Sequence, residues 1–183
     1  MSMRVTANEI YEYRTALSRI NKKAAEEVQE YMLAHKFLIN DTFIEFAHAI
    51  TTKYGEAAGA LSALFYDNVV GYDKVIQSGV EAPWRVFKGK SYEAAMPADT
   101  PPIEEVAKAV WGAKKKSLNE IPRAVSRLVK RTAEDTTLKN AIRDGMEFAW
   151  IPQGDTCPFC MMLAANEWQK ASKKILKKIL NLN

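Results

Sequence analysis

The chain has 183 residues, of which 48% are hydrophobic and 26% charged, a composition typical of a globular protein with one core or two small helical units. Its 8 Gly and 7 Pro are too few for a β fold with many turns. No stretch approaches the roughly 18 consecutive apolar residues of a membrane span. No apolar run follows the charged N-terminus, as one would in a secretory signal. We therefore expect a protein made in the cytoplasm, with no membrane partner.

Residues 1–76 are predicted to form a hairpin of two long helices. Thr6 and Glu9 have the spacing of a capping box, in which each side chain satisfies a free backbone amide at a helix start. Behind them, apolar residues recur at intervals of three and four to about Leu33. That pattern predicts the first helix.

Asn40 or Asp41 is the expected cap of the second helix, whose apolar periodicity continues to Val69. Gly55 and Gly59 lie inside this helix, four residues apart, although glycine disfavours helix by about 1 kcal/mol relative to alanine. We expect them to permit the close approach of a neighbouring helix.

Residues 77–102 are expected to be an irregular linker or a partner-binding arm, because the periodicity is lost there. Breaking residues are frequent in it: Gly79, Pro83, Gly89, Pro97, Pro101 and Pro102. Trp84 to Tyr92 is nevertheless too apolar for a free linker, so we expect this part to pack on the chain itself or on another subunit.

Residues 103–183 are predicted to form a small helical unit with at most one short strand or hairpin. Its expected elements are helices starting at Ile103, Pro122 and about Glu134, a stop at Gly145, an extended segment over Met146–Ile151, and a further helix after Cys160. Taken with the first two regions, this predicts a mainly α fold.

The net charge of +4 and the sequence pI near 9.0 arise from uneven clusters of basic residues. One cluster extends from Lys108 to Arg131 and includes Lys114, Lys115 and Lys116; the C-terminal part adds Lys173, Lys174, Lys177 and Lys178. Such clusters can bind a polyanion such as packaged DNA by neutralising phosphates, or can simply be solvated helix faces.

Cys157 and Cys160 form a C-x-x-C pair on a turn, where two thiolates can bind one face of a tetrahedral zinc ion. A structural zinc site needs four ligands, and the histidines His35 and His48 lie far away in the sequence, in the predicted hairpin. A thiol–disulfide site and a pair of inert buried thiols are the alternatives. The redox motif usually follows a strand of a βαβ unit, which this helical pattern does not predict.

No phosphate-binding loop, H-E-x-x-H, G-x-S-x-G or nucleotide fingerprint occurs in the sequence. The paired carboxylates, such as Glu104 and Glu105, are adjacent on helices and so point in different directions. We therefore expect no enzyme.

The segment Phe148-Ala149-Trp150-Ile151-Pro152, followed by Asp155-Thr156-Cys157-Pro158-Phe159-Cys160-Met161-Met162-Leu163-Ala164, resembles the C-terminal part of head-morphogenesis (MuF-like) minor head proteins from prophages of Gram-positive bacteria. Thr136 to Gly145 is similar to the helix that leads into this motif. The family continues into a Ser-Arg-Gly turn and a later His and C-x-C segment; here Ala165-Asn166-Glu167 replaces the turn and the later segment is absent. The resemblance thus supplies only Cys157 and Cys160 toward a zinc site.

The resemblance implies a structural protein of the virion head, present in the host cytoplasm during assembly. It implies contacts with portal and major capsid proteins and a role in head assembly, DNA packaging or ejection. We also expect self-association, because the Trp84 to Tyr92 arm is apolar. The alternatives are a small basic DNA-binding protein and a C-x-x-C thiol oxidoreductase.

Overall fold

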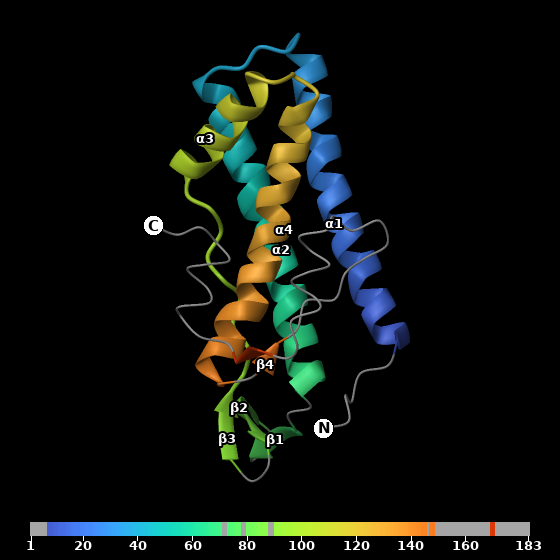
Figure 1. Ribbon diagram of the computed structural model, residues 1–183, viewed down its shortest axis with the longest axis vertical. Coiled ribbons are helices and arrows are strands. Elements are labelled where there is room, and N and C mark those ends of the chain that lie inside the picture. The colour runs from blue at the N-terminus through green and yellow to red at the C-terminus, as the bar shows by residue number, and fades with distance from the viewer. Residues whose placement is uncertain are drawn as a thin grey trace. The chain divides into compact units, whose positions relative to one another are not determined.

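The structure, a computed structural model, describes residues 7–70, 73–77, 80–87, 90–145, 147–148 and 169–170 (Figure 1). In these residues the helices are α1 (Ala7–Ala34), α2 (Asp41–Val70), α3 (Ile103–Lys114) and α4 (Glu120–Arg143). The strands are β1 (Asp73–Gln77), β2 (Val80–Phe87), β3 (Lys90–Glu93), β4 (Glu147–Phe148) and β5 (Gln169–Lys170). The fold is mainly α, as predicted.

The chain divides into two compact units, Met1–Thr137 and Leu138–Asn183, with the boundary inside α4. The first unit contains α1, α2, α3 and most of α4. The division expected from the sequence, at residues 76 and 102, stays a prediction.

Helices α1 and α2 form the predicted antiparallel hairpin. Asn40 is the cap of α2, because its side-chain Oδ1 accepts a hydrogen bond from the backbone N–H of Phe43 at 3.0 Å. Contacts between the helices pair early residues of one with late residues of the other: the ring of Tyr13 stacks on Phe65 at 4.1 Å, and that of Tyr31 on Phe46 at 4.0 Å. The second helix therefore runs back along the first.

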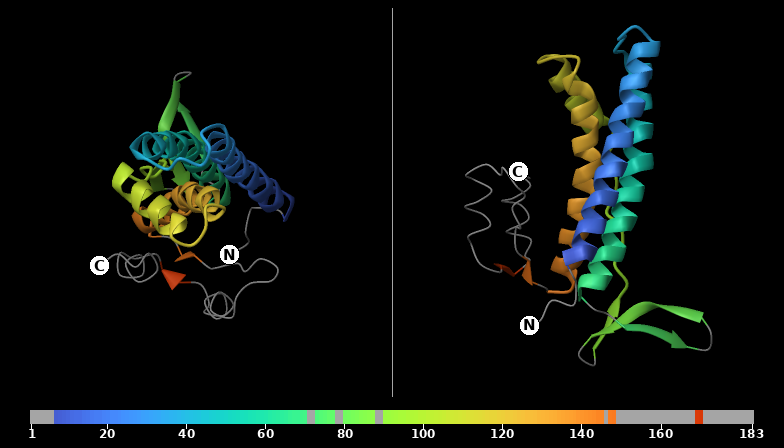
Figure 2. Two further views of the ribbon diagram at one scale, coloured as in Figure 1. Left: turned by 90° about the horizontal axis from the view of Figure 1, so that it is seen from above. Right: turned by 90° about the vertical axis from the view of Figure 1, so that its right-hand side faces the viewer.

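Helices α3 and α4 pack on this hairpin and complete the hydrophobic core of the first unit (Figure 2). The apolar face predicted for α3 is buried at Val106, Val110 and Ala113. Buried residues from all four helices fill the core: Ala24, Val28, Met32, Phe43, Ala47, Ile50, Ala58, Val106, Val110, Ile121, Val125, Leu128, Val129 and Ala133. Their spacing of three and four is the reason why the sequence pattern identified the helices.

The two glycines of α2 mark a close approach, as the sequence indicated. A Cβ atom at Gly55 would lie 2.9 Å from Thr100 Cγ2 and 3.3 Å from the Oγ1 of Thr132 in α4. At Gly59, a Cβ atom would lie 3.2 Å from Pro97 Cβ and 3.3 Å from Thr136 Oγ1. A side chain at Gly55 would force a neighbour to shift and one at Gly59 would be tightly packed, because α4 and an extended segment both contact this face of α2.

That extended segment, residues 94–102, is called the strap below. It runs along α2 toward the start of α3, and side chains of the helices hold its backbone. The N–H of Ala95 donates to Asp67 Oδ1 at 3.1 Å, and the N–H of Ala98 donates to Thr136 Oγ1 at 2.9 Å. The strap thus obtains from side chains the hydrogen bonds that a helix or sheet would supply.

Helix α4 is one continuous helix, whereas the sequence analysis divided it into two helices starting at Pro122 and about Glu134. That division was wrong because no glycine or proline separates the two predicted helices. An acidic residue such as Glu134 suits a helix start, but it is equally acceptable inside a helix. The hydroxyls of Thr132 and Thr136 donate to the carbonyls four residues earlier, at 3.3 and 2.7 Å, which lets them lie buried in the helix. The predicted stop is confirmed: Gly145 has a φ of 62° just after the helix.

Residues 73–93, most of which were expected to be irregular, contain a three-stranded antiparallel sheet in the order β1-β2-β3. The expected irregular linker was wrong here. The sequence argued against a strand because Pro83 has no backbone N–H to donate to a neighbouring strand. The pairing avoids this conflict. Lys74 pairs with Arg85 and Ile76 with Glu81, so one residue of β1 faces three of β2 in a bulge that contains Pro83. On the other side, the pairing of β2 with β3 begins at Trp84.

In the second unit, β4 pairs antiparallel with β5, joining Glu147 to Lys170 and Phe148 to Gln169. The strand expected within Met146–Ile151 is therefore present at Glu147–Phe148. The helix predicted after Cys160 is wrong at Gln169–Lys170, which is a strand, because a lysine-rich run with apolar spacing fits a helix and an edge strand alike. The rest of that predicted helix lies outside the described residues.

Candidate interaction surface

The turns between α1 and α2 and between α3 and α4 lie at the same end of the helical unit, the upper end in Figure 1, and the side view in Figure 2 agrees. The first turn covers residues 35–40 and the second residues 115–119. Together they bring Lys114, Lys115 and Lys116 to the end of the molecule that also carries the tip of the hairpin.

The α1–α2 turn has a left-handed backbone at two consecutive residues that are not glycine. Lys36 has a φ of 52° and Phe37 a φ of 59°. The N–H of Phe37 donates to the carbonyl of Met32 at 2.7 Å, and that of Lys36 to the carbonyl of Leu33 at 3.2 Å. These two bonds are those of a Schellman motif, in which glycine usually occupies the position of Lys36. A lysine and an aromatic residue in this conformation are strained.

This turn exposes three large apolar side chains. Leu33 is 56% exposed, Phe37 41% and Leu38 61%. We call these three residues the apolar tip. Single exposed leucines are common on protein surfaces, but three within six residues on a fixed turn form a local apolar feature that needs an explanation.

The three lysines from Lys114 to Lys116, called the lysine cluster, are exposed at the end of α3 and in the following turn. They form no salt bridge with any residue that the structure describes. Lys114 lies with its Nζ atom 4.7 Å from the ring centroid of Trp111, which is itself 37% exposed. Cations also suit the C-terminal end of a helix. Within the described part of the chain, the cluster is therefore a positive surface without an acidic partner, and Lys114 lies over an aromatic ring.

The remaining basic residues of the predicted cluster between Lys108 and Arg131 are largely neutralised. Arg123 lies 2.8 Å from Glu120, and Arg127 lies 3.7 Å from the same carboxylate. Lys130 lies 3.4 Å from Glu134. The charge run seen in the sequence is thus not one continuous basic face: its part on α4 is paired with acids, whereas Lys108 and the lysine cluster have no ion pair with a described residue.

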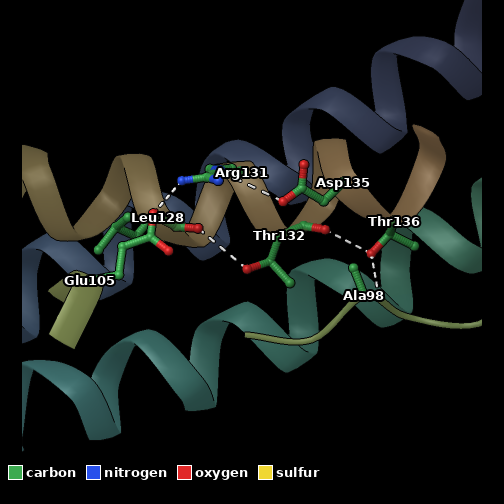
Figure 3. A network of polar contacts seen from close by, with 7 residues as sticks. All are labelled: Ala98, Glu105, Leu128, Arg131, Thr132, Asp135 and Thr136. Carbon is green, nitrogen blue, oxygen red and sulfur yellow. Dashed lines mark hydrogen bonds and ion pairs between the residues drawn. The ribbon is translucent and has the colours of Figure 1, made fainter. Parts of the chain in front are cut away.

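A polar network fixes α3 against α4 (Figure 3). Arg131 of α4 donates a short hydrogen bond to Glu105 of α3, and its Nε atom lies 3.6 Å from Asp135. Both side chains of the first pair are about one-third exposed, so solvent only partly screens their attraction. The network thus holds the first turn of α3 against α4.

A second polar link joins α1 to α2 near the middle of the hairpin. Glu27 accepts hydrogen bonds from Lys53 at 2.8 Å and from the hydroxyl of Tyr54. Both hydrogen bonds lower the pKa of the Glu27 carboxyl, and the bond from Lys53 has the larger effect. The hydrogen bond to Glu27 in turn raises the pKa of Tyr54. Farther along, burial raises the pKa of Tyr13, whose hydroxyl lies 2.8 Å from Ser62 Oγ.

The two histidines have ordinary surroundings in the part of the chain that the structure describes. His35 stacks on Tyr31 at 3.9 Å, and its Nδ1 atom lies 2.9 Å from the Tyr31 carbonyl. His48 is half-buried on α2. Among the described residues, no three His, Cys, Asp or Glu side chains come together where they could hold a metal ion.

Several predicted site residues lie outside the described residues. They are the candidate zinc ligands Cys157 and Cys160 and the C-terminal lysines Lys173, Lys174, Lys177 and Lys178. Zinc binding, thiol chemistry and DNA contact by the C-terminal lysines therefore stay predictions. In the helices that the structure describes, none has the length and apolarity needed to cross a membrane.

Comparison with protein families supplies the remaining observation. The sequence model of a family described as VG15 protein matches residues 4–179, nearly the whole chain. The chain belongs to the VG15 family. This is a family of viral proteins of the phage type, so the phage origin inferred from the sequence is confirmed at this level. Neither a curated protein nor a solved structure matches this VG15 protein.

The apolar tip of this VG15 protein was missed in the sequence. The expected helix ended near Leu33 and the next began at Asn40, so the residues between them were passed over as a short link. One feature could have indicated the tip: Phe37, Leu38 and Ile39 are three consecutive apolar residues in a turn without glycine or proline. Three neighbouring side chains of a turn do not all reach the core, and the structure buries only Ile39 of the three.

Proposed function

We propose that this VG15 protein is a structural minor head protein of a tailed phage, without enzymatic activity of its own. It assists head assembly, DNA packaging or ejection near the portal. The observation that carries the proposal is the family match over residues 4–179, which supports a viral origin for nearly the entire chain. The segment from Thr136 to Ala164, with its likeness to MuF-like minor head proteins, supports the head specifically.

The chemistry of the described surface is compatible with a protein that works by contact. A packed four-helix unit carries, at one end, exposed apolar side chains and lysines that have no ion pair with a described residue. Such surfaces are typical of partner-binding sites. The proposed partners are the portal and major capsid proteins of the same phage, and further copies of this chain.

The proposal is tested by purifying virions of the phage that encodes the chain and measuring its copy number per head by quantitative mass spectrometry. We expect a small, constant number of copies. Deletion of the gene should reduce the yield of DNA-filled heads in electron micrographs, and expression of the chain in trans should restore it. A chain absent from procapsids and virions, with normal heads formed in the deletion strain, would refute the proposal.

A small DNA-binding protein is the second candidate, favoured by the lysine cluster, which has no described acidic partner. DNA binding through phosphate contacts weakens steeply with salt. If three lysines contact phosphates, the logarithm of the affinity should fall with the logarithm of the salt concentration with a slope of about −2.7, and replacing Lys115 and Lys116 by Gln should reduce that slope by about 2. Tight DNA binding with no affinity for head proteins would favour this candidate over the first.

A further inference from the structure

We propose that the apolar tip and the lysine cluster form one docking surface for a protein partner. The matching surface on that partner is a small apolar pocket bordered by carboxylates. This inference rests on the proposed function, because the partner is sought among the phage head proteins. It adds to that function the surface by which the chain binds and the chemistry that the surface recognises.

The backbone of the α1–α2 turn is the first observation. Lys36 and Phe37 adopt left-handed conformations, with φ values of 52° and 59°. Glycine or asparagine would adopt these conformations with less strain. The Phe37 side chain nevertheless stays 41% exposed, so a large part of an apolar ring faces solvent. A strained residue with an exposed apolar side chain indicates that its use lies outside the fold.

The arrangement of the tip is the second observation. Leu33 on the last turn of α1, together with Phe37 and Leu38, presents apolar surface at one end of the hairpin. The hydrogen bonds from Phe37 to Met32 and from Leu38 to His35 hold the turn in one conformation. Because the turn is already ordered, a partner binds it without the entropic cost of ordering a loop.

Charge complementarity determines the rest of the partner's surface. The lysine cluster lies in the α3–α4 turn at the same end of the unit and has no described acidic partner. Carboxylates around the partner's pocket would meet these cations, accelerate association and select against basic surfaces. The result is an apolar centre with a charged border, the usual arrangement of a protein–protein interface.

The same surface fits other macromolecules less well. Nucleic acid is bound mainly through phosphates by charged and polar donors, so three aliphatic and aromatic side chains would gain little from it. Three partly exposed side chains with three lysines also offer only marginal anchoring to an anionic lipid surface. A pocket in a protein uses both components at once.

The test uses the full chain and the purified portal and major capsid proteins of its phage, with binding measured by biolayer interferometry. The tip variant combines Leu33→Gln, Phe37→Asn and Leu38→Gln. Asn suits the left-handed backbone of position 37, and all three side chains are at least 41% exposed, so the variant should stay folded. Its circular dichroism spectrum and melting temperature are measured beside the binding. The matched control is Leu64→Gln, because Leu64 is 63% exposed on α2, away from the tip.

We expect the tip variant to bind a head protein at least tenfold more weakly, and the Leu64 variant to bind within threefold of the unchanged chain. A second pair isolates the charges. Replacing Lys115 and Lys116 by Gln should slow association and flatten its dependence on salt. The same change at Lys22 and Lys23 of α1 should leave both unaltered.

Two results separate the inference from the proposed function. If a head protein binds the tip variant as tightly as the unchanged chain, the docking surface is wrong and the proposed function stands. If the unchanged chain binds neither head protein, both are wrong. Binding to vesicles of equal phosphatidylglycerol and phosphatidylcholine, or to duplex DNA, that the tip variant alone abolishes while head-protein binding persists would overturn the inference in favour of that ligand.

Discussion

Replacement of Gly55 by Ala tests the close approach of α2, α4 and the strap. An alanine inside a helix is favoured over glycine by about 1 kcal/mol. At Gly55, however, the new methyl group would lie 2.9 Å from Thr100 Cγ2, closer than carbon atoms can approach without movement. Thr100 is β-branched and stiff, so the strap itself must shift. Overpacking of this kind costs about 1–3 kcal/mol, which equals or exceeds the gain from helix propensity.

Gly112 is the matched control. It also lies in a helix, α3, but a Cβ atom there would meet nothing within 4 Å. Gly112→Ala should therefore raise the free energy of unfolding by about 0.5–1 kcal/mol, whereas Gly55→Ala should leave it unchanged or lower it by up to about 2 kcal/mol. Gly59→Ala should behave like Gly55→Ala in a weaker form, because its nearest contact is 3.2 Å from Pro97.

Urea and thermal unfolding followed by circular dichroism measure the difference. For a chain of this size, 1 kcal/mol corresponds to a change of about 2–4 °C in the melting temperature. Equal stabilisation of all three alanine variants would show that the strap and α4 do not lie as closely against α2 as described, and the packing argument would be refuted.

Three further predictions concern the turns and the polar links. Lys36→Gly should raise the free energy of unfolding in urea by about 1 kcal/mol, because glycine adopts the left-handed backbone of this position without strain. Lys115→Gly should lower the free energy of unfolding, because φ is −61° there. A change of the same sign at both sites would contradict the strain at Lys36. The lowered pKa of Glu27 contributes stability above the ordinary carboxyl pKa that is lost as the pH falls through the folded-state value. Glu27→Gln should therefore reduce the fall in melting temperature between about pH 6 and about pH 3, the range in which carboxyl groups titrate, and an unchanged pH profile would exclude the effect. A double-mutant cycle of Arg131→Gln and Glu105→Gln should give a coupling of about 0.5–1 kcal/mol, and a value near zero would show that the pair does not hold α3 to α4.

The helices could be predicted because their apolar residues repeat with the helical period and their starts carry chemical marks. Asn40 was one of two expected caps, and only the geometry decided that its side chain, and not that of Asp41, bonds the helix start. The close approach at Gly55 and Gly59 was also predictable, because glycines four apart inside a helix need a reason. The strap was not, since its hydrogen bonds come from side chains such as Thr136 that are distant in sequence.

The sheet was missed for a different physical reason. A proline in a run of strand-forming residues argues against a strand, and only the pairing register reveals that a bulge accommodates Pro83. Only the basic half of the candidate surface was predicted, because the lysine cluster is visible as charge in the sequence. Which of the basic residues are neutralised depends on acidic partners such as Glu120, which only the helix geometry identifies. The composition of the α1–α2 turn could have suggested the apolar tip, but only the turn conformation at Phe37 decides which of its apolar side chains are exposed.

The hydrogen bond from the Ala95 N–H to Asp67 has a consequence for how this architecture can vary. It joins the point where the chain leaves α2 to the point where it comes back, so the intervening stretch with β1, β2 and β3 is a loop whose base is already closed. The entropy of closing such a loop grows only slowly with its length. Insertions or deletions within that stretch would therefore change the sheet and its turns but leave the helices intact. The stretch is thus the place in the fold best suited to sequence diversification or to the grafting of a foreign sequence.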